Sequence, residues 1–303
     1  MTGRTIHRIE TISRYHDVMG LPHPEHPLVS VIDYTTAQLP CIARVSIIFD
    51  FYAILLDRNF KGNMKYGQQR CDFEAGVLFF LAPGQVFEVD AQETVNRSGW
   101  LLLVHPDLLW NTALAKTIHQ YAFFDYSIHE ALFLSDKEET TVLNILQNMA
   151  QEYSGNIDKF SGPVIIAQLE LLLTYADRFY QRQFVTRKKI NHQVLDRLEE
   201  LLSNYFNSDD VIKKGLPTVQ FIAAQLNLSP KYLSNLLRSL TGQNTQQHIH
   251  DKVLEKAKEK LSTTNLSVTE IAYELGFEHL QSFSKLFKAK TQLSPLQFRQ
   301  SFN

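Results

Sequence analysis

The sequence is poor in cysteine, glycine and proline, with two, twelve and ten of these among its 303 residues. Cys41 and Cys71 stand far apart and form no CxxC pair, which argues against a disulfide framework and against a cysteine-based structural zinc site. We expect two reduced, buried thiols. Because glycine and proline are scarce, long flexible linkers are not expected. The length of the chain predicts two domains.

Long hydrophobic runs are also missing. The most apolar stretch, residues 45–56, is interrupted by Asp50 and is shorter than the roughly 20 apolar residues that cross a bilayer. Residues 1–17 mix charges and lack the apolar segment of a secretion signal. We therefore expect a cytoplasmic protein that does not enter a membrane. A hydrophobic fraction of 44% with 20% charged residues excludes a disordered or collagen-like chain.

The net charge of −2 conceals an uneven distribution. Residues 1–185 carry 14 Lys and Arg against 21 Asp and Glu, whereas residues 186–303 carry 16 against 11. A basic C-terminal part joined to an acidic N-terminal part is typical of a chain whose C-terminal part binds a polyanion. Chance variation gives the same pattern, so charge alone leaves both interpretations open.

Short runs rich in β-branched and aromatic residues occupy residues 29–104 and predict strands. The runs are VSVIDY, RVSIIFDFYAILLD, GVLFFLAPG, FEVD and GWLLLVH, with turn residues at 59–62, 82–84 and 96–99. Several short strands at this spacing favour a β-sandwich or β-barrel over a parallel α/β sheet.

Residues 106–183 change to a helical pattern. Pro106 suits a first helical turn, and Ser135 with Glu138 resembles a capping box ahead of ETTVLNILQNMAQEY. A second long helix with a wide apolar stripe is predicted over 161–183. The apolar faces of these helices suit either a core or a dimer interface.

A short basic run, Arg187-Lys188-Lys189, follows and is interpreted as a domain junction, although a solvated linker would have the same composition. Beyond it the sequence is helical to its end. The most informative feature there is an internal repeat. Residues 218–242 read TVQFIAAQLNLSPKYLSNLLRSLTG, and residues 267–292 read SVTEIAYELGFEHLQSFSKLFKAKTQ. The first halves align at an offset of 49 and, after one inserted residue, the second halves align at 50.

Each copy has the order of a helix-turn-helix unit. Thr218 and Ser267 suit the N-cap of a short helix, and Asn227 and Gly276 tolerate the left-handed conformation of a tight turn. The second helix places polar residues outward, of types that reach base edges in a major groove or hold phosphates. These predicted DNA-binding residues are Lys231, Tyr232, Ser234, Asn235 and Arg238 in the first unit and His279, Gln281, Ser282, Ser284, Lys285 and Lys288 in the second. A generic helical bundle with solvated faces is the alternative, and two units in tandem disfavour it.

Between the units, residues 244–264 predict one long helix that separates them rigidly. Apolar residues at four-residue spacing form its buried stripe. Its lysines can meet phosphates, but Glu255 can pair with Lys252 or Lys258, so a solvated, ion-paired face is the better interpretation.

Residues from about 190 to 303 resemble the DNA-binding domain of the AraC/XylS family of transcription regulators. The resemblance rests on IAAQLNLSPKYLSNLLRSLTG, on LEKAKEKL, and on VTEIAYELGFEHLQSFSKLFKAKTQLSPLQFR, whose GF pair and SPLQFR ending are a specific signature. By position, the resemblance implies base contacts in one major groove by Lys231, Ser234 and Asn235. It implies base contacts in the next groove by Gln281, Ser284 and Lys285, and phosphate contacts by Arg238 and Lys288.

The chain departs from the family pattern at four positions. Gln292 and Thr245 stand where the family often has Gly and Pro, which bears on local turns. Ser234 and Asn235 are shorter than the side chains often found there, which weakens base readout by the first unit.

The N-terminal part resembles the cupin-like sensor domains of the same family, through its run of strands, FFLAPGQ and HPDLL. The resemblance implies an α+β multidomain chain with a cupin-like β-barrel at 1–105, a helical dimerisation segment at 106–185 and an all-α domain with two helix-turn-helix units at 186–303. It implies double-stranded DNA, RNA polymerase, a small-molecule effector in the barrel and a second copy of the chain, bound through 106–183, as partners. No cofactor and no enzymatic activity are expected.

A cupin-type metal-dependent enzyme with a helical appendage is the alternative function, and a regulator controlled only by its abundance is a third. The enzyme would need closely spaced His residues on strands, and no HxH occurs in the strand region. His248 and His250 form an HxH on the linker helix, where residues two apart do not share a face. We expect structural roles for the histidines and aromatics of the N-terminal part: His23, His26, His105, Phe49, Phe51, Phe79 and Phe87.

Overall fold

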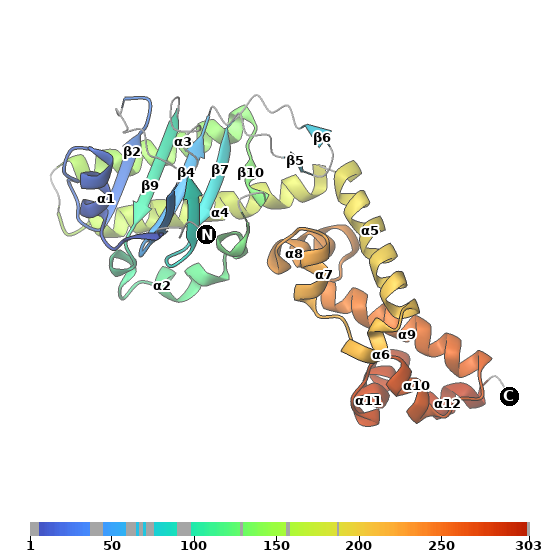
Figure 1. The fold of residues 1–303 in the computed structure, drawn as a ribbon. Coiled ribbons are helices and arrows are strands. Elements are labelled where there is room, and N and C mark those ends of the chain that lie inside the picture. The colour runs from blue at the N-terminus through green and yellow to red at the C-terminus, as the bar shows by residue number, and fades with distance from the viewer. Residues whose placement is uncertain are drawn as a thin grey trace. The chain divides into compact units, whose positions relative to one another are not determined.

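The computed structural model describes residues 6–36, 45–58, 65–66, 69–70, 76–89, 98–127, 130–155, 158–186 and 188–301 (Figure 1). The chain divides into two compact units, Met1–Gln183 and Phe184–Asn303. The predicted division into three segments stays a prediction. Cys41 and Cys71 lie outside the described residues, and so do the turn residues at 59–62.

The described strands of the N-terminal unit form two larger sheets and a short ribbon. A five-stranded sheet has the order β10-β7-β4-β9-β2, and a three-stranded sheet has the order β1-β3-β8. Pairing is antiparallel throughout except for β1 with β3, which run parallel. The strands are β1 (Ile6–Ile9), β2 (Val29–Asp33), β3 (Val45–Phe49), β4 (Tyr52–Asp57), β5 (Lys65–Tyr66), β6 (Gln69–Arg70), β7 (Val77–Leu81), β8 (Val86–Val89), β9 (Gly99–Val104) and β10 (Leu132–Phe133).

The predicted strand run RVSIIFDFYAILLD is shared between the two larger sheets. Its first half forms β3 in the three-stranded sheet, and its second half forms β4 in the five-stranded sheet. The break falls at Asp50, whose backbone N–H donates to the Ile9 carbonyl at 3.1 Å. Consecutive strands of the chain thus join different sheets. The described strands form small, mainly antiparallel sheets, and a closed cupin barrel is not seen among them.

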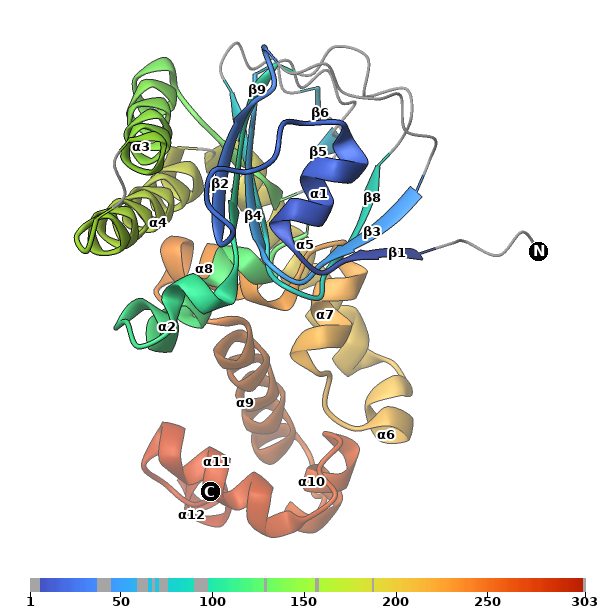
Figure 2. The same ribbon diagram turned by 90° about the vertical axis from the view of Figure 1, so that its left-hand side faces the viewer.

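A shared core lies between the two larger sheets and α1 (Ile12–Met19). Figure 2 shows α1 on one side of the five-stranded sheet and α3 with α4 on the other. Two tyrosine hydroxyls meet inside this core, since the Tyr15 and Tyr34 oxygens lie 2.7 Å apart. Phe49 and Phe51 stack within it at a ring distance of 5.1 Å, as expected for core aromatics.

Helices cap the two outer edges of the five-stranded sheet. At the β2 edge, the Tyr153 hydroxyl accepts from the Val31 N–H at 2.7 Å and donates to the Val31 carbonyl at 3.2 Å. At the β10 edge, the Gln183 amide accepts from the Phe133 N–H at 2.9 Å and donates to the Ala131 carbonyl at 3.2 Å. Side chains thus replace the hydrogen bonds that a further strand would make.

The helices of this region begin near their predicted residues. Pro106 opens a short 3-10 helix, and the Ser135 N–H donates to the Glu138 carboxylate at 2.8 Å in a capping box. The helical elements are η2 (Pro106–Leu109), α2 (Leu114–Thr117), η3 (Ile118–Gln120), η4 (Ala122–Asp125), α3 (Asp136–Ser154) and α4 (Ser161–Thr186).

The second unit is helical throughout its described residues. Its helices are α5 (Lys188–Asn207), α6 (Asp210–Lys214), α7 (Val219–Gln225), α8 (Pro230–Thr241), α9 (Thr245–Thr263), α10 (Val268–Glu274), α11 (Leu280–Thr291) and α12 (Pro295–Gln300). The predicted basic junction thus opens a helix, because α5 begins at Lys188. Among the described helices of the whole chain, none combines the length and apolarity needed to cross a membrane.

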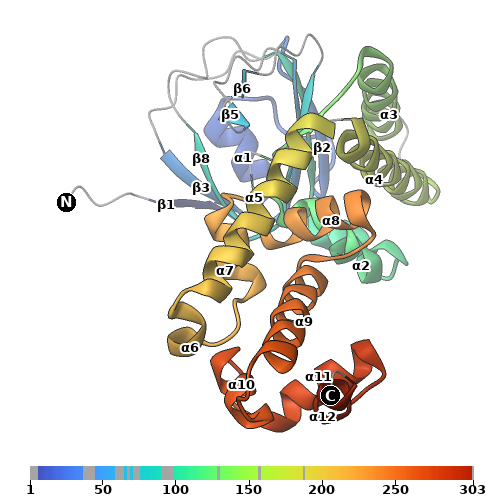
Figure 3. The ribbon, with the colours of Figure 1, turned by 90° about the vertical axis from the view of Figure 1, so that its right-hand side faces the viewer.

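Helix α9 organises the second unit, as predicted. Figure 3 shows it running from α8 toward α10, α11 and α12, and it packs against α5, α8, α10 and α12. Its stripe of Ile249, Val253, Ala257 and Leu261 is buried. An Asn244–Gln247 capping box fixes its first turn. One continuous helix therefore carries both repeat units.

Candidate nucleic-acid interface

The first repeat unit, α7 and α8, is a helix-turn-helix. The Thr218 hydroxyl caps α7 by accepting from the Phe221 N–H at 3.1 Å. Asn227 takes the left-handed conformation that the turn requires, with a φ of 56°. The Leu228 N–H then bonds the Ala223 carbonyl at 2.9 Å, which closes the end of α7. Ser229 caps α8 in turn.

The second unit, α10 and α11, repeats this geometry. Gly276 occupies the position of Asn227 with a φ of 82°. The Phe277 N–H bonds the Ala272 carbonyl at 3.0 Å, the counterpart of the bond in the first unit. The inserted residue of the second copy falls in the turn, because α11 begins at Leu280 after Glu278 and His279. The structure thus pairs α8 with α11 residue by residue.

Gly276 is needed for packing as well as for its conformation. A Cβ at this position would lie 2.8 Å from the Val211 carbonyl oxygen and 2.9 Å from the Gly215 carbonyl carbon. The turn of the second helix-turn-helix unit therefore lies against the backbone of α6 and of Gly215, which follows it.

The outer face of α8 exposes two of its predicted cations. Lys231 and Arg238 are exposed, and Asn235 between them is partly buried. The Arg238 guanidinium donates to the Asn235 side-chain oxygen at 3.4 Å. Residues 231, 235 and 238 lie on one face of the helix, so this face offers positive charge with one amide.

Ser234 is partly buried and is held by a hydrogen bond within the protein. Its hydroxyl lies 3.0 Å from the hydroxyl of Thr245, the fully buried first residue of α9. Thr245 stands at the position where the family often has proline, and here it ties α9 to α8. Base contact by Ser234 stays a prediction.

The prediction that Tyr232 faces outward is wrong. Its side chain is 1% exposed and packs edge-to-face on Phe184, with ring centroids 5.2 Å apart. Position 232 corresponds to the exposed Ser282 in the second unit, so the repeat alone gives no sign of burial. The partner, Phe184, lies 48 positions earlier in the sequence, so the helical periodicity around Tyr232 does not predict the contact.

The outer face of α11 is the more open of the two. Gln281, Ser282, Lys285 and Lys288 are exposed, and Ser284 is partly buried. Gln281 and Lys285 are one helical turn apart on the same face. His279 is exposed at the N-cap, where its side chain makes no capping hydrogen bond. Apart from the exposed Glu278 that precedes the helix, this face combines amide, hydroxyl and ammonium groups without a carboxylate.

The lysines of α9 are largely committed to ion pairs. Lys252 pairs with Glu255 at 2.8 Å, Lys256 with Glu259 at 3.0 Å, and Lys260 with Glu274 at 2.6 Å. The prediction of a solvated, ion-paired face is confirmed. The cations of α8 and α11 are therefore better placed than those of α9 to meet a polyanion.

The histidines take structural positions. His248 lies 2.9 Å from the Thr241 hydroxyl, and His250 lies 2.8 Å from the Gln246 amide, so the two rings do not face one site. Burial lowers the pKa of both. His105 accepts from the Asp107 N–H as the cap of η2. Among the described residues, no group of three or more His, Cys, Asp or Glu side chains is placed to hold a metal.

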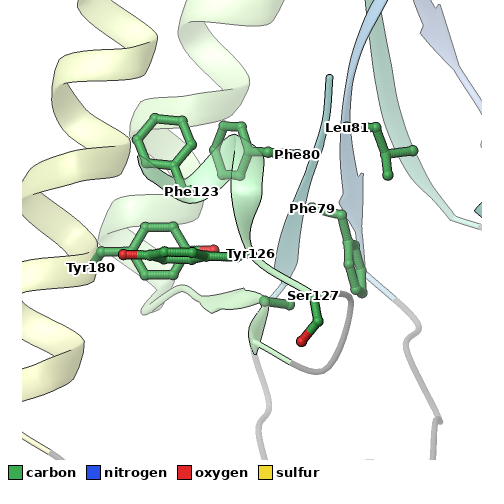
Figure 4. Close-up of a pocket in the computed structure, with 8 residues that line it drawn as sticks. Phe79, Phe80, Leu81, Phe123, Tyr126, Ser127 and Tyr180 are labelled. Carbon is green, nitrogen blue, oxygen red and sulfur yellow. The ribbon is translucent and has the colours of Figure 1, made fainter. Parts of the chain in front are cut away.

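A small hollow in the N-terminal unit is lined by aromatic side chains (Figure 4). Phe123 and Tyr180 stack at 5.7 Å, and Tyr126 meets Tyr180 edge-on at 5.2 Å. The volume of about 10 Å³ has room for about one water and is far below that of a ligand pocket. Phe79, expected in the core, is buried beside it, whereas the side chain of Phe87 lies outside the described residues.

Sequence reasoning missed two residues that shape this interface. Phe184 anchors Tyr232, and Asp251 of α9 accepts hydrogen bonds from Gln243 at 2.8 Å and from Lys290 at 3.1 Å. Asp251 lies on the same helical face as Asn244 and His248, at spacings of seven and three. That spacing does not reveal its partners, because the contact with Lys290 is tertiary.

Comparison with known proteins gives a consistent result. A family model described as a helix-turn-helix domain matches residues 222–301. The uncharacterized HTH-type transcriptional regulator YfiF of Bacillus subtilis is 29% identical over 75% of this chain and 63% of that protein. The transcriptional activator RhaS of Escherichia coli is 37% identical over 26% of this chain and 28% of that protein. The chain thus matches less than two thirds of the length of these relatives.

A solved structure gives a further match, to about a third of the chain. The C-terminal domain of the response regulator yesN from Fusobacterium nucleatum is 33% identical, covers 33% of this chain and 96% of that domain, and gives a TM-score of 0.28. Its sequence identity extends over nearly that whole domain. The family model, the similarity to these regulators and the tandem helix-turn-helix units show that the chain belongs to the AraC/XylS family of transcription regulators.

Proposed function

We propose that this chain binds specific DNA sequences and regulates their transcription, with α8 and α11 entering two successive major-groove segments on one face of the duplex. The observation that carries the proposal is the pair of equivalent helix-turn-helix units on one rigid helix. Each unit exposes a polar face with cations: Lys231 and Arg238 on α8, and Lys285 and Lys288 on α11. Recognition helices of this type read the major groove through their N-terminal residues.

The length of α9 supports two adjacent grooves. Its 19 residues span about 28 Å at 1.5 Å per residue, close to the roughly 34 Å of one duplex turn. A stiff spacer of this length keeps both recognition helices on the same side of the DNA.

The proposed roles follow position on each helix. Lys231 and Asn235, and in the second unit Gln281, Ser284 and Lys285, face bases, because they stand toward the N-terminal half of their helices. Arg238 and Lys288 stand farther along and serve phosphates. Ser234 contributes to base readout only if its bond to Thr245 opens, so the second unit carries more of the specificity.

We assign control to the N-terminal unit. A small-molecule effector held by the β-domain would shift the balance between states that present the DNA-binding unit differently. Helix α4 begins in the first unit and ends at Thr186, in the second. This continuous helix supports such coupling along the chain. Homodimerisation through 106–183 is supported by the exposed Phe160 and Leu171. RNA polymerase in the cytoplasm is the proposed partner in regulation.

A salt series of DNA binding tests the proposal. Full-length protein and a fragment of residues 184–303 are incubated with a pool of genomic fragments; the fragment starts at Phe184 to keep its packing on Tyr232. Steep salt dependence with enrichment of discrete sites is the expected result, because released counterions dominate affinity. Tighter binding by the fragment would support restraint by the N-terminal unit. Folded protein that enriches no site at low salt would contradict the proposal.

A further inference from the structure

The two helix-turn-helix units are attached to α9 by separate polar contacts. The first unit is attached near the start of α9, through Ser234 with Thr245 at 3.0 Å and Thr241 with His248 at 2.9 Å. The second is attached near its end, where the Lys260 ammonium pairs with Glu274 at 2.6 Å. Each of these contacts fixes one unit without reference to the other.

Asp251 contacts both units. Its Oδ2 accepts from the Gln243 Nε2 at 2.8 Å, and Gln243 directly follows Gly242, the C-cap of α8. Its Oδ1 accepts from the Lys290 Nζ at 3.1 Å, and Lys290 lies in the last turn of α11. One carboxylate on one turn of α9 therefore holds the C-terminal ends of both recognition helices.

From this geometry we propose that Asp251 is a positioning residue that sets the separation of the two recognition helices, and with it the spacing between the half-sites of the operator. The inference rests on the proposed function for its DNA consequence. The C-terminal end of a recognition helix points away from the base edges. A link between these two ends constrains the distance between the reading ends without occupying them.

The strength of the link is limited by exposure. The side chains of Asp251 and Lys290 are 41% and 36% exposed, so their ion pair is partly screened by water and salt. The contacts of Asp251 therefore narrow the range of separations between α8 and α11, and the fold does not depend on them. The buried stripe of α9 holds the helices together in their absence.

The first experiment measures, without DNA, the separation of the two helix-turn-helix units, with one label on α7, which packs against α8, and one on α11. Spin labels are attached in the full chain at Ala224→Cys on α7 and Ala289→Cys on α11, both exposed, with Cys41→Ser and Cys71→Ser. We expect Asp251→Ala to broaden or shift the distance distribution measured by double electron–electron resonance. Asp251→Asn, which keeps the shape and a neutral acceptor, gives a smaller change. The matched control is Glu255→Ala, which removes an α9 carboxylate whose ion pair, with Lys252, lies within the same helix.

The second experiment measures operator spacing. Half-sites are first selected with the unaltered protein, and its affinity is then compared for the preferred spacing and for spacings one base pair longer and shorter. We expect Asp251→Ala to reduce the preference about threefold, with the sequence of each half-site unchanged, and Glu255→Ala to leave it intact.

The outcomes separate the two proposals. An unchanged distance distribution in folded Asp251→Ala would overturn the positioning role, and so would an unchanged spacing preference. Failure of the unaltered protein to select any DNA would instead overturn the proposed function, and the spin-label distances would still decide whether Asp251 positions the helices.

Discussion

Gln281 and Lys285 on α11 and Arg238 on α8 lie exposed at positions that suit different contacts. The first two share one face of the N-terminal half of α11, whereas Arg238 lies in the last turn of α8. A side chain that reads a base edge contributes about 1–3 kcal/mol to discrimination, whereas a phosphate contact stabilises all sequences alike.

We therefore predict that Gln281→Ala and Lys285→Ala weaken binding to the selected site more than binding to a scrambled duplex. Arg238→Ala weakens both about equally and lowers the salt slope by about one. Fluorescence anisotropy with the two duplexes at several salt concentrations measures this. If all three variants bind the selected site as the unaltered protein does, the proposed docking of both helices is wrong.

Two turn positions give opposite predictions for stability. Gln292 ends α11 with a φ of 63°, a conformation that costs a residue with a Cβ about 1–2 kcal/mol. Gln292→Gly is therefore expected to stabilise the second helix-turn-helix unit, α10 and α11, by about 0.5–1 kcal/mol. This figure includes the larger entropy of glycine in the unfolded chain. Gly276→Ala is expected to destabilise it by more than 1 kcal/mol, because its Cβ meets backbone.

Urea unfolding of the two variants, followed by circular dichroism, measures both effects. The two variants form a matched pair. One adds a Cβ and the other removes one, each at a left-handed residue that follows the C-terminal end of a helix. Equal stability of Gly276→Ala and the unaltered protein would show that the backbone after α6 moves aside.

At the scale of elements, local signals predicted boundaries well and tertiary choices poorly. The predicted linker helix of 244–264 is observed as Thr245–Thr263, because its capping box and its four-residue stripe are both local. The division of RVSIIFDFYAILLD between two sheets was not predicted, since both halves have the same β-branched pattern. Strand β1 and helix α1 were also missed. They are four and eight residues long, which is too short for a clear period.

The contact of α4 with the β10 edge gives a prediction at this scale. Gln183 is 1% exposed and satisfies both the Phe133 N–H and the Ala131 carbonyl. Gln183→Ala leaves two buried backbone groups without these partners, so we expect a loss of about 2–3 kcal/mol in the stability of the N-terminal unit. Gln181→Ala, exposed on the same helix, is the control and should change stability little. A similar midpoint of urea unfolding for the two variants would contradict the prediction.

For the whole molecule, the charge asymmetry and the repeat located the DNA-binding unit before any contact was known. The candidate interface was predictable because an exposed helix face obeys local periodicity. Tyr232 was the exception, since an amphipathic side chain suits either environment and its partner Phe184 is distant in sequence. Asp251 was beyond reach for the same reason, because its role depends on two units meeting one helix. Position in the repeat thus predicts which residues lie on the outer face, except where a partner distant in sequence buries one. It does not show which polar groups are already bound within the protein.

Histidines that are buried or partly buried, in both units, give the last prediction. Burial lowers the pKa of His16 and His26 in the first unit and of His248 and His250 in the second, below the ordinary value of 6.5. In the unfolded chain these rings take up a proton near pH 6.5, whereas in the folded chain they stay neutral to lower pH. Below about pH 6.5 the unfolded state therefore binds more protons, and stability falls as the pH drops.

Urea midpoints at pH 7.5, 6.5 and 5.5 measure this loss above the range in which carboxylates titrate. His16 has the most enclosed position of these rings, with its nitrogens 2.5 Å from the Pro22 carbonyl oxygen and 2.9 Å from the Ser30 hydroxyl. His16→Gln should therefore flatten the pH dependence of the first unit while lowering its stability at pH 7.5. His119→Gln, which replaces an exposed imidazole on η3, is the control for the substitution itself. A slope that is the same in both variants would mean that His16 becomes protonated in the folded chain as readily as in the unfolded one.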